Sequence, residues 1–288
     1  MASKMKNNKV LKDFIYKHKN VRAVANKTVL VYGDVYASLV DFEEHLSGKH
    51  NVLIPPYKMR GRLGAAKDYR LMAEEYYKIF LTVCDLKPSD CVLDVGCGTG
   101  RLAYLLTNYL VEGSYYGFDV IESIVNWCKK TFEPRFPNFH FQFVDVHNNM
   151  YNPTGKIKSS LFKFPFDSNK FDFVFLASVF THMVPADMEN YLTEISRVLK
   201  PDGRCLISYI IKRTGKDTSP SFPFFIGNGC WVTDKNHLEG TVAYEENYLR
   251  LLYQKKALQL IEPIYYGRWC REKSKPLTIQ DLVLAKKG

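Results

Sequence analysis

An alternation of apolar and amphipathic stretches between residues 91 and 211 constrains this fold more than any other feature of the sequence. Short runs rich in Val, Leu and Phe have the composition of buried parallel strands and lie at 91–96, 114–120, 139–146, 171–180 and 203–211. The stretches between them have a helical period and lie at 101–110, 121–132 and 187–200. Strands joined by helical crossovers form a doubly wound sheet, so we predict an α/β fold of this kind.

The segments on either side of this alternation complete the predicted domain organisation. Helical periods lie at 35–48, 69–86 and 247–260, and two late strands are predicted at 261–267 and 278–286. We predict a basic, helical extension at 1–51, followed by one domain at 52–288. Within that domain, 212–240 is rich in Gly, Ser, Thr, Pro and aromatic residues, which predicts a substrate-side insertion rather than a core element.

Charge and cysteine content narrow the function classes. The formal net charge is +10, and residues 1–27 hold eight Lys or Arg against one acid, which predicts either an anionic partner or a solvated basic leader. Seven scattered cysteines without a Cys-x-x-Cys pair exclude a zinc knuckle, and nothing in the residues suggests a metal. Neither a secretory signal nor an apolar run of membrane-spanning length occurs, so we predict a cytoplasmic protein.

The turn after the first predicted strand, DVGCGTGR at 94–101, indicates the class of cofactor. A dinucleotide-binding turn reads Gly-x-Gly-x-x-Gly, but Arg101 stands where the third glycine would be. Asp94 would repel a pyrophosphate and attract an ammonium group, while the N-terminus of the following helix favours a carboxylate. An amino-acid zwitterion carries both groups, and the methionine part of S-adenosylmethionine is such a zwitterion.

Acidic residues at the ends of the next two predicted strands fit an adenosine. Asp119 can accept hydrogen bonds from both ribose hydroxyls, as an acid also does in NAD sites, so it does not separate the two cofactors. Asp145 can accept a hydrogen bond from the adenine amino group, and Val146 can pack on the ring. A lone acid at a strand end is often only a turn residue, but acids at three successive strand ends indicate a shared ligand.

The order and spacing of these motifs resemble the class I S-adenosylmethionine-dependent methyltransferases. The resemblance covers residues 52–286, and its runs are VLDVGCGTGRLA, YYGFDV, FVDV, FDFVFLASVFTHM and EISRVLKPDGRCLIS. It implies a mostly parallel seven-stranded sheet with an antiparallel last strand, and a cofactor that leaves as S-adenosylhomocysteine. With the resemblance, the expected cofactor site comprises Asp94, Gly96, Cys97, Gly98, Gly100, Asp119, Val120, Asp145, Val146 and Ala177.

The resemblance also bears on the acceptor. Runs such as WCKKTF and NMYNPTG look like a bacterial and archaeal branch of small-molecule methyltransferases, some of which modify sugars. We therefore expect the acceptor to be a hydroxyl of a sugar or glycan precursor. The Asn/Asp-Pro-Pro-aromatic signature of amino-group methylation is absent after the fourth predicted strand, where LASVF stands instead.

Transfer to a hydroxyl needs a base, and His182, just past the fourth predicted strand, is the candidate. The alternative is a histidine that caps the following helix; His147 is a second candidate base, and His140 is expected to be structural. Candidate substrate contacts come from three loops, each of which could instead be solvated or pack on its own domain. They are Arg60, Arg62, Tyr69, Trp231 and Arg268.

Three other functions remain compatible with parts of the sequence. The basic N-terminal region would suit an RNA or protein methyltransferase, although no RNA-binding module is present. A nicotinamide-dependent oxidoreductase shares Asp119 but not the turn at Asp94 and Arg101. A non-catalytic cofactor binder would keep the same glycines and acids. The sequence fixes neither the acceptor nor the oligomeric state.

Overall fold

The computed structural model describes residues 19–62, 69–213, 222–270 and 276–288 of the 288-residue chain. The chain divides into two compact units, Met1–Lys67 and Asp68–Gly288. The sequence placed this boundary earlier, between residues 51 and 52. In the first unit, α3 (Lys19–Leu46) begins well before the helix predicted at 35–48, and α4 (Tyr57–Arg62) follows it.

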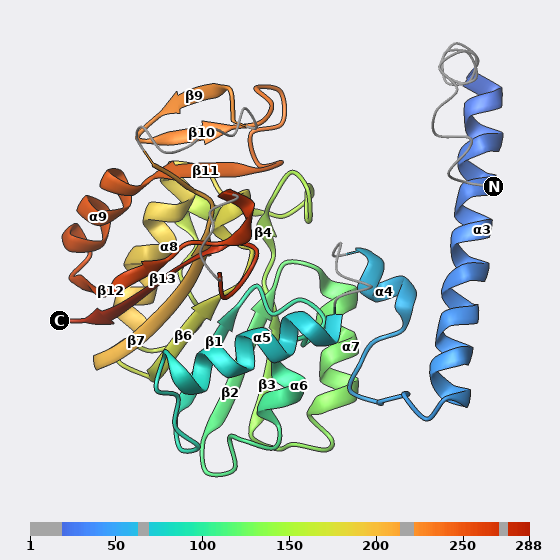
Figure 1. Ribbon diagram of the computed structural model, residues 1–288, viewed down its shortest axis with the longest axis horizontal. Coiled ribbons are helices and arrows are strands. Elements are labelled where there is room, and N and C mark those ends of the chain that lie inside the picture. The colour runs from blue at the N-terminus through green and yellow to red at the C-terminus, as the bar shows by residue number, and fades with distance from the viewer. Residues whose placement is uncertain (1–18, 63–68, 214–221, 271–275) are drawn as a thin grey trace. The chain divides into compact units, whose positions relative to one another are not determined.

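A seven-stranded sheet forms the centre of the second unit (Figure 1). Its spatial order is β12-β13-β7-β6-β1-β2-β3. The strands are β1 (Cys91–Val95), β2 (Ser114–Asp119), β3 (Phe139–Phe143), β6 (Phe171–Leu176), β7 (Leu199–Tyr209), β12 (Leu258–Tyr265) and β13 (Asp281–Lys287). The last strand, β13, runs antiparallel to both of its neighbours, while β3, β2, β1, β6 and β7 pair in parallel. This confirms the predicted doubly wound sheet with an antiparallel last strand.

Helices cover both faces of this sheet (Figure 1). They are α5 (Tyr69–Thr82), α6 (Ala103–Leu106), α7 (Glu122–Phe132), α8 (Pro185–Val198) and α9 (Glu246–Lys255), with short 3-10 turns η1 (Ser159–Leu161), η2 (Phe180–His182) and η3 (Arg268–Cys270). On one face, Phe80 of α5 packs against Phe173 and Phe175 of β6, with ring centroids 5.3 and 4.7 Å apart. On the other face, α8 and α9 bury Leu192 and Leu252 in the main hydrophobic cluster. The parallel strands β1, β2 and β6 are therefore buried along most of their length, whereas β3, at the edge of the sheet, alternates between buried and exposed residues.

Two predicted helices are shorter in the structure. The stretch 101–110 is α-helical only at α6, and its remainder is a series of turns. The helix predicted at 247–260 ends at Lys255, because the chain turns at Ala257, where φ is +54°, and continues as β12. The apolar residues after that turn fit the helical period of 3.6 as well as the strand period of 2, so the sequence pattern did not show where the helix ends and the strand begins.

The segment predicted as an insertion carries regular structure. It supplies β9 (Phe224–Gly227) and β10 (Cys230–Val232), which pair with β11 (Val242–Glu245) and β8 (Ile211–Lys212) in a second sheet of order β8-β11-β10-β9. The expectation that it is no core element is wrong, because Cys230 and Val232 are fully buried in the main cluster. A third, two-stranded sheet joins β4 (Val146–His147) to β5 (Ile157–Lys158).

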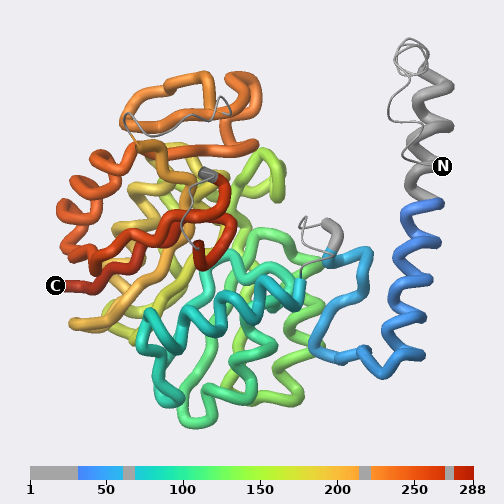
Figure 2. The backbone as a smooth tube through the Cα atoms, viewed as in Figure 1, coloured from blue at the N-terminus to red at the C-terminus, as the bar shows by residue number. Residues whose placement is uncertain are grey.

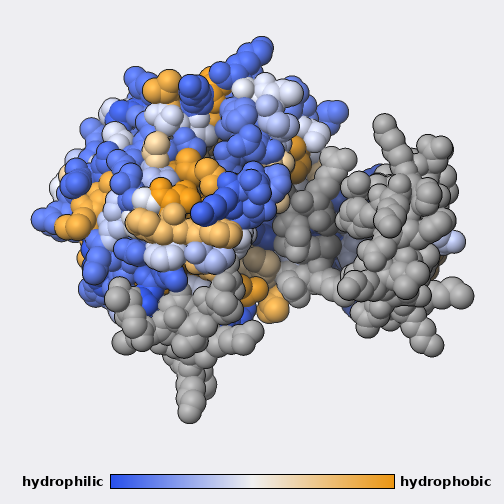
Figure 3. Space-filling view, turned by 90° about the horizontal axis from the view of Figure 1, so that it is seen from above, coloured by the Kyte–Doolittle hydropathy of each residue, from blue (hydrophilic) through white to orange (hydrophobic). Residues whose placement is uncertain are grey.

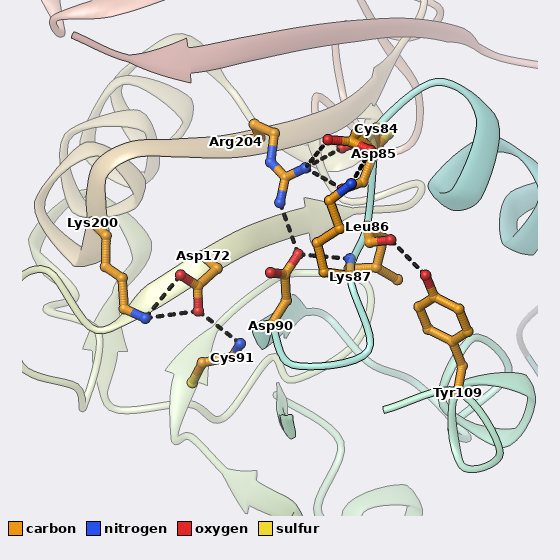
Figure 4. Close-up of polar contacts among 10 residues, drawn as sticks. All are labelled: Cys84, Asp85, Leu86, Lys87, Asp90, Cys91, Tyr109, Asp172, Lys200 and Arg204. Carbon is orange, nitrogen blue, oxygen red and sulfur yellow. Dashed lines mark hydrogen bonds and ion pairs between the residues drawn. The ribbon is translucent and has the colours of Figure 1, made fainter. Parts of the chain in front are cut away.

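A polar network ties the amino-terminal ends of the strands together (Figure 4). The Arg204 guanidinium of β7 donates to the Asp90 carboxylate over 2.7 Å and to the Cys84 carbonyl over 2.6 Å. Asp172 of β6 accepts from the Lys200 ammonium and from the Cys91 backbone N–H, over 2.7 and 2.8 Å. Because these contacts lie at the edge opposite the carboxyl ends, they serve the fold and leave the other edge to ligands.

The strands β1, β2 and β6 are adjacent and parallel, so their carboxyl ends lie together at one edge of the sheet. The chain path can be followed in Figure 2. The surface of the second unit in Figure 3 is mainly hydrophilic, with apolar residues in separate patches. Among the described residues, no helix has the length and apolar character needed to cross a bilayer.

Candidate cofactor and acceptor site

The glycine turn after β1 has a backbone that only glycine adopts readily. The φ angles of Gly96, Gly98 and Gly100 are +77°, +52° and +72°. A Cβ on Gly96 would lie 2.5 Å from a methyl carbon of Val179, and one on Gly100 would lie 2.8 Å from the ring of Phe132. The turn therefore lies directly against its neighbours and presents bare backbone at the carboxyl end of β1.

Asp119, the last residue of β2, lies against this turn. Its carboxylate accepts hydrogen bonds from the backbone N–H groups of Gly98 and Ile121, over 2.8 and 3.0 Å. Burial raises the pKa of Asp119 above its usual value, although these N–H groups act in the opposite direction. Val120 follows it and is half-buried. The structure thus brings the predicted ribose-binding acid to the glycine turn.

Asp94, inside β1, is a buried acid without a cationic partner among the residues that hydrogen-bond to it. Its side chain accepts a hydrogen bond of 2.6 Å from the Tyr115 hydroxyl, and the residue is 2 % exposed. The pKa of Asp94 is raised to about 7, chiefly by burial and also by the nearby Asp119, against the opposing effects of Tyr115 and Arg101. An ammonium group at this position would be favourable, because it would stabilise the ionised form.

Arg101 lies at the end of the same turn, and sequence reasoning used it only to exclude a dinucleotide. Its guanidinium contacts the Met72 sulfur over 3.5 Å, and its Nε is buried without a hydrogen-bond partner among the described residues. A buried donor without an acceptor costs free energy that an anionic ligand would recover. Its place directly after the glycines was the signal that could have identified it.

After β3, the side chain of Asp145 is partly exposed, whereas that of Val146 is buried. The Asp145 side chain is half-buried, 3.4 Å from the Asn152 amide, while its carbonyl accepts the N–H groups of Lys156 and Ile157. Val146 is 1 % exposed and belongs to the main hydrophobic cluster. The Asp145 carboxylate is accessible to a ligand, whereas the Val146 side chain contributes to the core.

Beyond β6, Ala177 is half-buried and Ser178 has a φ of +63°, a conformation that is costly for a residue other than glycine. Two hydrogen bonds hold Ser178 there. Its N–H donates to the Ser208 hydroxyl over 2.7 Å, and its own hydroxyl donates to the Gln280 side chain over 3.0 Å. The sequence analysis missed this network, because its members are up to 102 residues apart.

His182 lies in η2, on the same edge of the sheet. Its Nδ1 is 3.0 Å from the Glu239 carbonyl, and its ring packs at 88° to that of Tyr151. Since a carbonyl only accepts, Nδ1 carries the proton and Nε2 is left as the basic nitrogen. The alternative in which His182 caps the next helix does not hold, because Val184 is the N-cap of α8 and makes no side-chain cap bond.

Two further histidines considered in the sequence, His147 and His140, lie on strands of different sheets. His147 is half-buried in β4. His140 is exposed on β3, with its ring 4.8 Å from that of Tyr116.

The residues predicted to clamp the substrate have partners within the protein. Arg60, 3 % exposed, donates to both carboxylate oxygens of Glu44 over 2.9 Å and to Asp41 over 3.4 Å. These acids already neutralise the Arg60 charge, so the predicted role for it as an anion clamp is wrong. The Tyr69 hydroxyl donates to the Thr99 carbonyl over 3.2 Å, which places Tyr69 behind the glycine turn rather than in an acceptor site.

The remaining substrate candidates are also engaged. The Trp231 indole N–H donates to Glu245 over 2.9 Å, and the Lys212 ammonium lies 4.3 Å from the ring centre. Arg268 is exposed and pairs with Glu75 over 3.3 Å. The side chain of Arg62 lies outside the described residues, as do residues 1–18 of the basic leader. No group of three or more His, Cys, Asp or Glu residues within the described ranges is arranged to hold a metal ion.

Comparisons with known proteins agree with this geometry. Residues 93–207 match the methyltransferase domain family. The chain is 33% identical over 112 residues to the phthiotriol/phenolphthiotriol dimycocerosates methyltransferase of Mycobacterium tuberculosis, covering 39% of this chain and 34% of that protein. It is 27% identical over 122 residues to the 2-phytyl-1,4-naphtoquinone methyltransferase of Trichormus variabilis, covering 42% and 47%.

The chain thus spans less than half the length of these relatives. Among solved structures, a protein from Pyrococcus horikoshii has the same fold. It superimposes with a TM-score of 0.52 at 18% identity, over 77% of this chain and 92% of that one.

Proposed function

We propose that the chain is a class I S-adenosylmethionine-dependent methyltransferase that transfers a methyl group from this cofactor to a small-molecule acceptor. Its residues 93–207 match the methyltransferase domain family. One observation carries the proposal. A buried acid, Asp94, and the half-buried Arg101, whose Nε has no hydrogen-bond partner among the described residues, stand at the two ends of one glycine turn. A ligand with an ammonium and a carboxylate group matches both charges.

The residues of this edge fit that cofactor. Asp94 would bind the ammonium group and Arg101 the carboxylate, while the glycine turn allows close approach of the backbone. Asp119 would accept from the ribose hydroxyls, and Asp145 from the adenine amino group. When bound, the cofactor supplies a methyl group on a positively charged sulfur, which makes that methyl group electrophilic.

The acceptor side needs a base, and we assign this role to His182. Its Nε2 would take the proton of an acceptor hydroxyl while Nδ1–H remains bonded to the Glu239 carbonyl, which fixes the orientation of the ring. The Tyr151 ring packs edge-on against the His182 ring, and the Glu239 side chain accepts from the Asn149 backbone N–H over 2.7 Å, so both contacts help to hold the imidazole in place.

We infer that the acceptor is a hydroxyl of a sugar or glycan precursor. The proposal rests on the base at His182, which a hydroxyl requires. The matched relatives are named for a quinone and for a phthiotriol lipid, both small molecules, which supports the broader class.

Calorimetric titration of S-adenosylhomocysteine tests the cofactor site. We expect binding in the micromolar range, no response to NAD, and about 10- to 100-fold weaker binding for Arg101→Met, which removes a charge-assisted hydrogen bond. Because the Arg101 Nε has no hydrogen-bond partner among the described residues, this variant should melt close to the wild-type temperature. Binding of NAD, or equal affinity of the variant, would contradict the proposed site. A screen of glycosides and nucleotide sugars, read by mass spectrometry as a gain of one methyl group, then tests the acceptor.

A further inference from the structure

Helix α3 carries a stripe of exposed apolar side chains that the proposed function does not use. Each of its six members is more than half exposed: Tyr32 (72%), Val35 (53%), Tyr36 (54%), Leu39 (61%), Phe42 (61%) and Leu46 (71%). Single exposed apolar residues are common on protein surfaces, but a contiguous row of this size marks an interaction site.

Three acids of α3, Asp34, Asp41 and Glu44, lie on its opposite side, where α4 packs. The exposed Glu43 lies about 40° from Leu39, within the angular range of the stripe. Asp34 pairs with Lys58 over 2.9 Å, and the buried Arg60 pairs with Asp41 and Glu44. Asp41 lies about 200° around the helix from Leu39, the middle of the stripe. Among the described residues, α4 reaches the stripe at Tyr36, whose ring lies 5.6 Å from that of Tyr57, and all six members of the stripe stay more than half exposed.

Four of the six members form pairs at equal distances on either side of Leu39. Tyr32 and Leu46 lie seven residues before and after it, and Tyr36 and Phe42 lie three residues before and after it. Val35 has no apolar counterpart, because the residue four positions after Leu39 is the exposed Glu43. A pair of related helices around a two-fold axis needs such self-complementary spacing. Apolar residues three and four positions apart are also the pattern that packs one helix along another.

The area of the stripe fits a dimer. Six side chains with these exposed fractions present on the order of 600 Å² per copy, so two copies would bury about 1,200 Å². This total is at the lower end of the range for specific, stable interfaces.

We propose that two copies of this chain associate through the stripe, with α3 of one copy antiparallel to α3 of the other. In this arrangement Leu39 lies on the two-fold axis, Tyr32 faces the partner's Leu46, and Tyr36 faces the partner's Phe42. The proposal does not depend on the reaction that the second unit carries out.

Sedimentation velocity of the full chain between about 1 and 100 μM tests the association. We expect the mass of a dimer for the wild type and the mass of a monomer for the double variant Leu39→Glu/Phe42→Glu. The matched control is Gly33→Glu, which adds a charge to the same helix where a Cβ meets nothing within 4 Å; it should remain dimeric. Equal helix content of all three by circular dichroism shows that they are folded.

Two outcomes would overturn the proposal. A wild type that sediments as a monomer throughout this range has no such interface. A double variant that stays dimeric places the interface elsewhere. If the wild type is a monomer and the double variant melts at a lower temperature than the wild type, the stripe packs on its own chain instead of on a second copy.

Cysteine cross-linking tests the direction of the helices. Tyr32→Cys mixed with Leu46→Cys should give a disulfide-linked pair of chains on a non-reducing gel, while Tyr32→Cys alone should not. Cross-linking of the single variant Tyr32→Cys would contradict the antiparallel arrangement.

Discussion

Replacing Asp94 by asparagine should stabilise the ligand-free protein at neutral and higher pH. Burial raises the pKa of Asp94 from 3.8 to about 7 in the folded state. Between these values the folded protein holds a proton that the unfolded chain has lost, so the free energy of unfolding falls as the pH rises. Above pH 7 the whole difference of about three pKa units remains, which is about 4 kcal/mol. Asparagine is neutral at every pH and avoids this cost, while its carbonyl still accepts from Tyr115.

The magnitude gives a measurable shift. For a unit of this size, 1 kcal/mol corresponds to about 2–4 °C in the melting temperature, so Asp94→Asn should melt about 8–16 °C above the wild type at pH 8. At pH 5 the gain should be only about 2 kcal/mol, because Asp94 is then protonated in the folded wild type. Scanning calorimetry of both proteins at the two pH values measures this difference.

The control is Asp202→Asn. Asp202 has a side chain 79% exposed, and its backbone φ of +63° is one that asparagine tolerates. It should show no such dependence on pH. A gain for Asp94→Asn that is equal at pH 5 and pH 8, or a loss at pH 8, would refute the reasoning about the buried carboxylate.

Three further results are expected. Arg204→Leu leaves the buried Asp90 without its charged partner and should lower the free energy of unfolding, measured in urea, by about 3 kcal/mol. The control Lys286→Ala removes an exposed ion pair on the adjacent strand and should lower it by less than about 1 kcal/mol. Equal losses in the two variants would contradict this prediction. His182→Gln should lower the rate of methyl transfer to a hydroxyl about 10²- to 10⁴-fold and leave the affinity for S-adenosylhomocysteine, measured by calorimetry, unchanged. The control His140→Gln should change neither the rate nor the affinity. A wild-type rate for His182→Gln would exclude His182 as the base. Gly96→Ala should destabilise the fold by about 1–3 kcal/mol in thermal melts, because its Cβ meets a side chain at 2.5 Å in a left-handed turn; a wild-type melting temperature would show that the turn relaxes.

The sequence predicted the parts of the fold that local patterns determine. The central strands β1 and β6 are buried along most of their length, so each appears in the sequence as a short, mainly apolar run. The turn at Asp94 could be interpreted because its glycines, acid and arginine are adjacent in the chain. The antiparallel position of β13 came from the family resemblance, since no local pattern encodes a strand's direction.

The parts that were missed depend on distant contacts. Arg60 looked like a loop cation, and only the folded chain shows that α3 surrounds it with Asp41 and Glu44. Ser178, Ser208 and Gln280 form a site-edge network from three separate elements, and no spacing rule connects them. The short strands at 224–232 contain glycines and a bulge, which mask a period of two.

The position of Asp119 has a consequence for divergent copies of this enzyme. Its carboxylate closes the glycine turn through the Gly98 N–H before any ligand arrives, so the residue contributes to folding as well as to binding. A pseudoenzyme that no longer used the cofactor would still lose stability if Asp119 changed, and selection would keep it. Arg101, whose Nε serves no other part of the protein among the described residues, carries no such constraint. Loss of the arginine, rather than of the acid, would then be the earlier mark of a lineage that has abandoned catalysis.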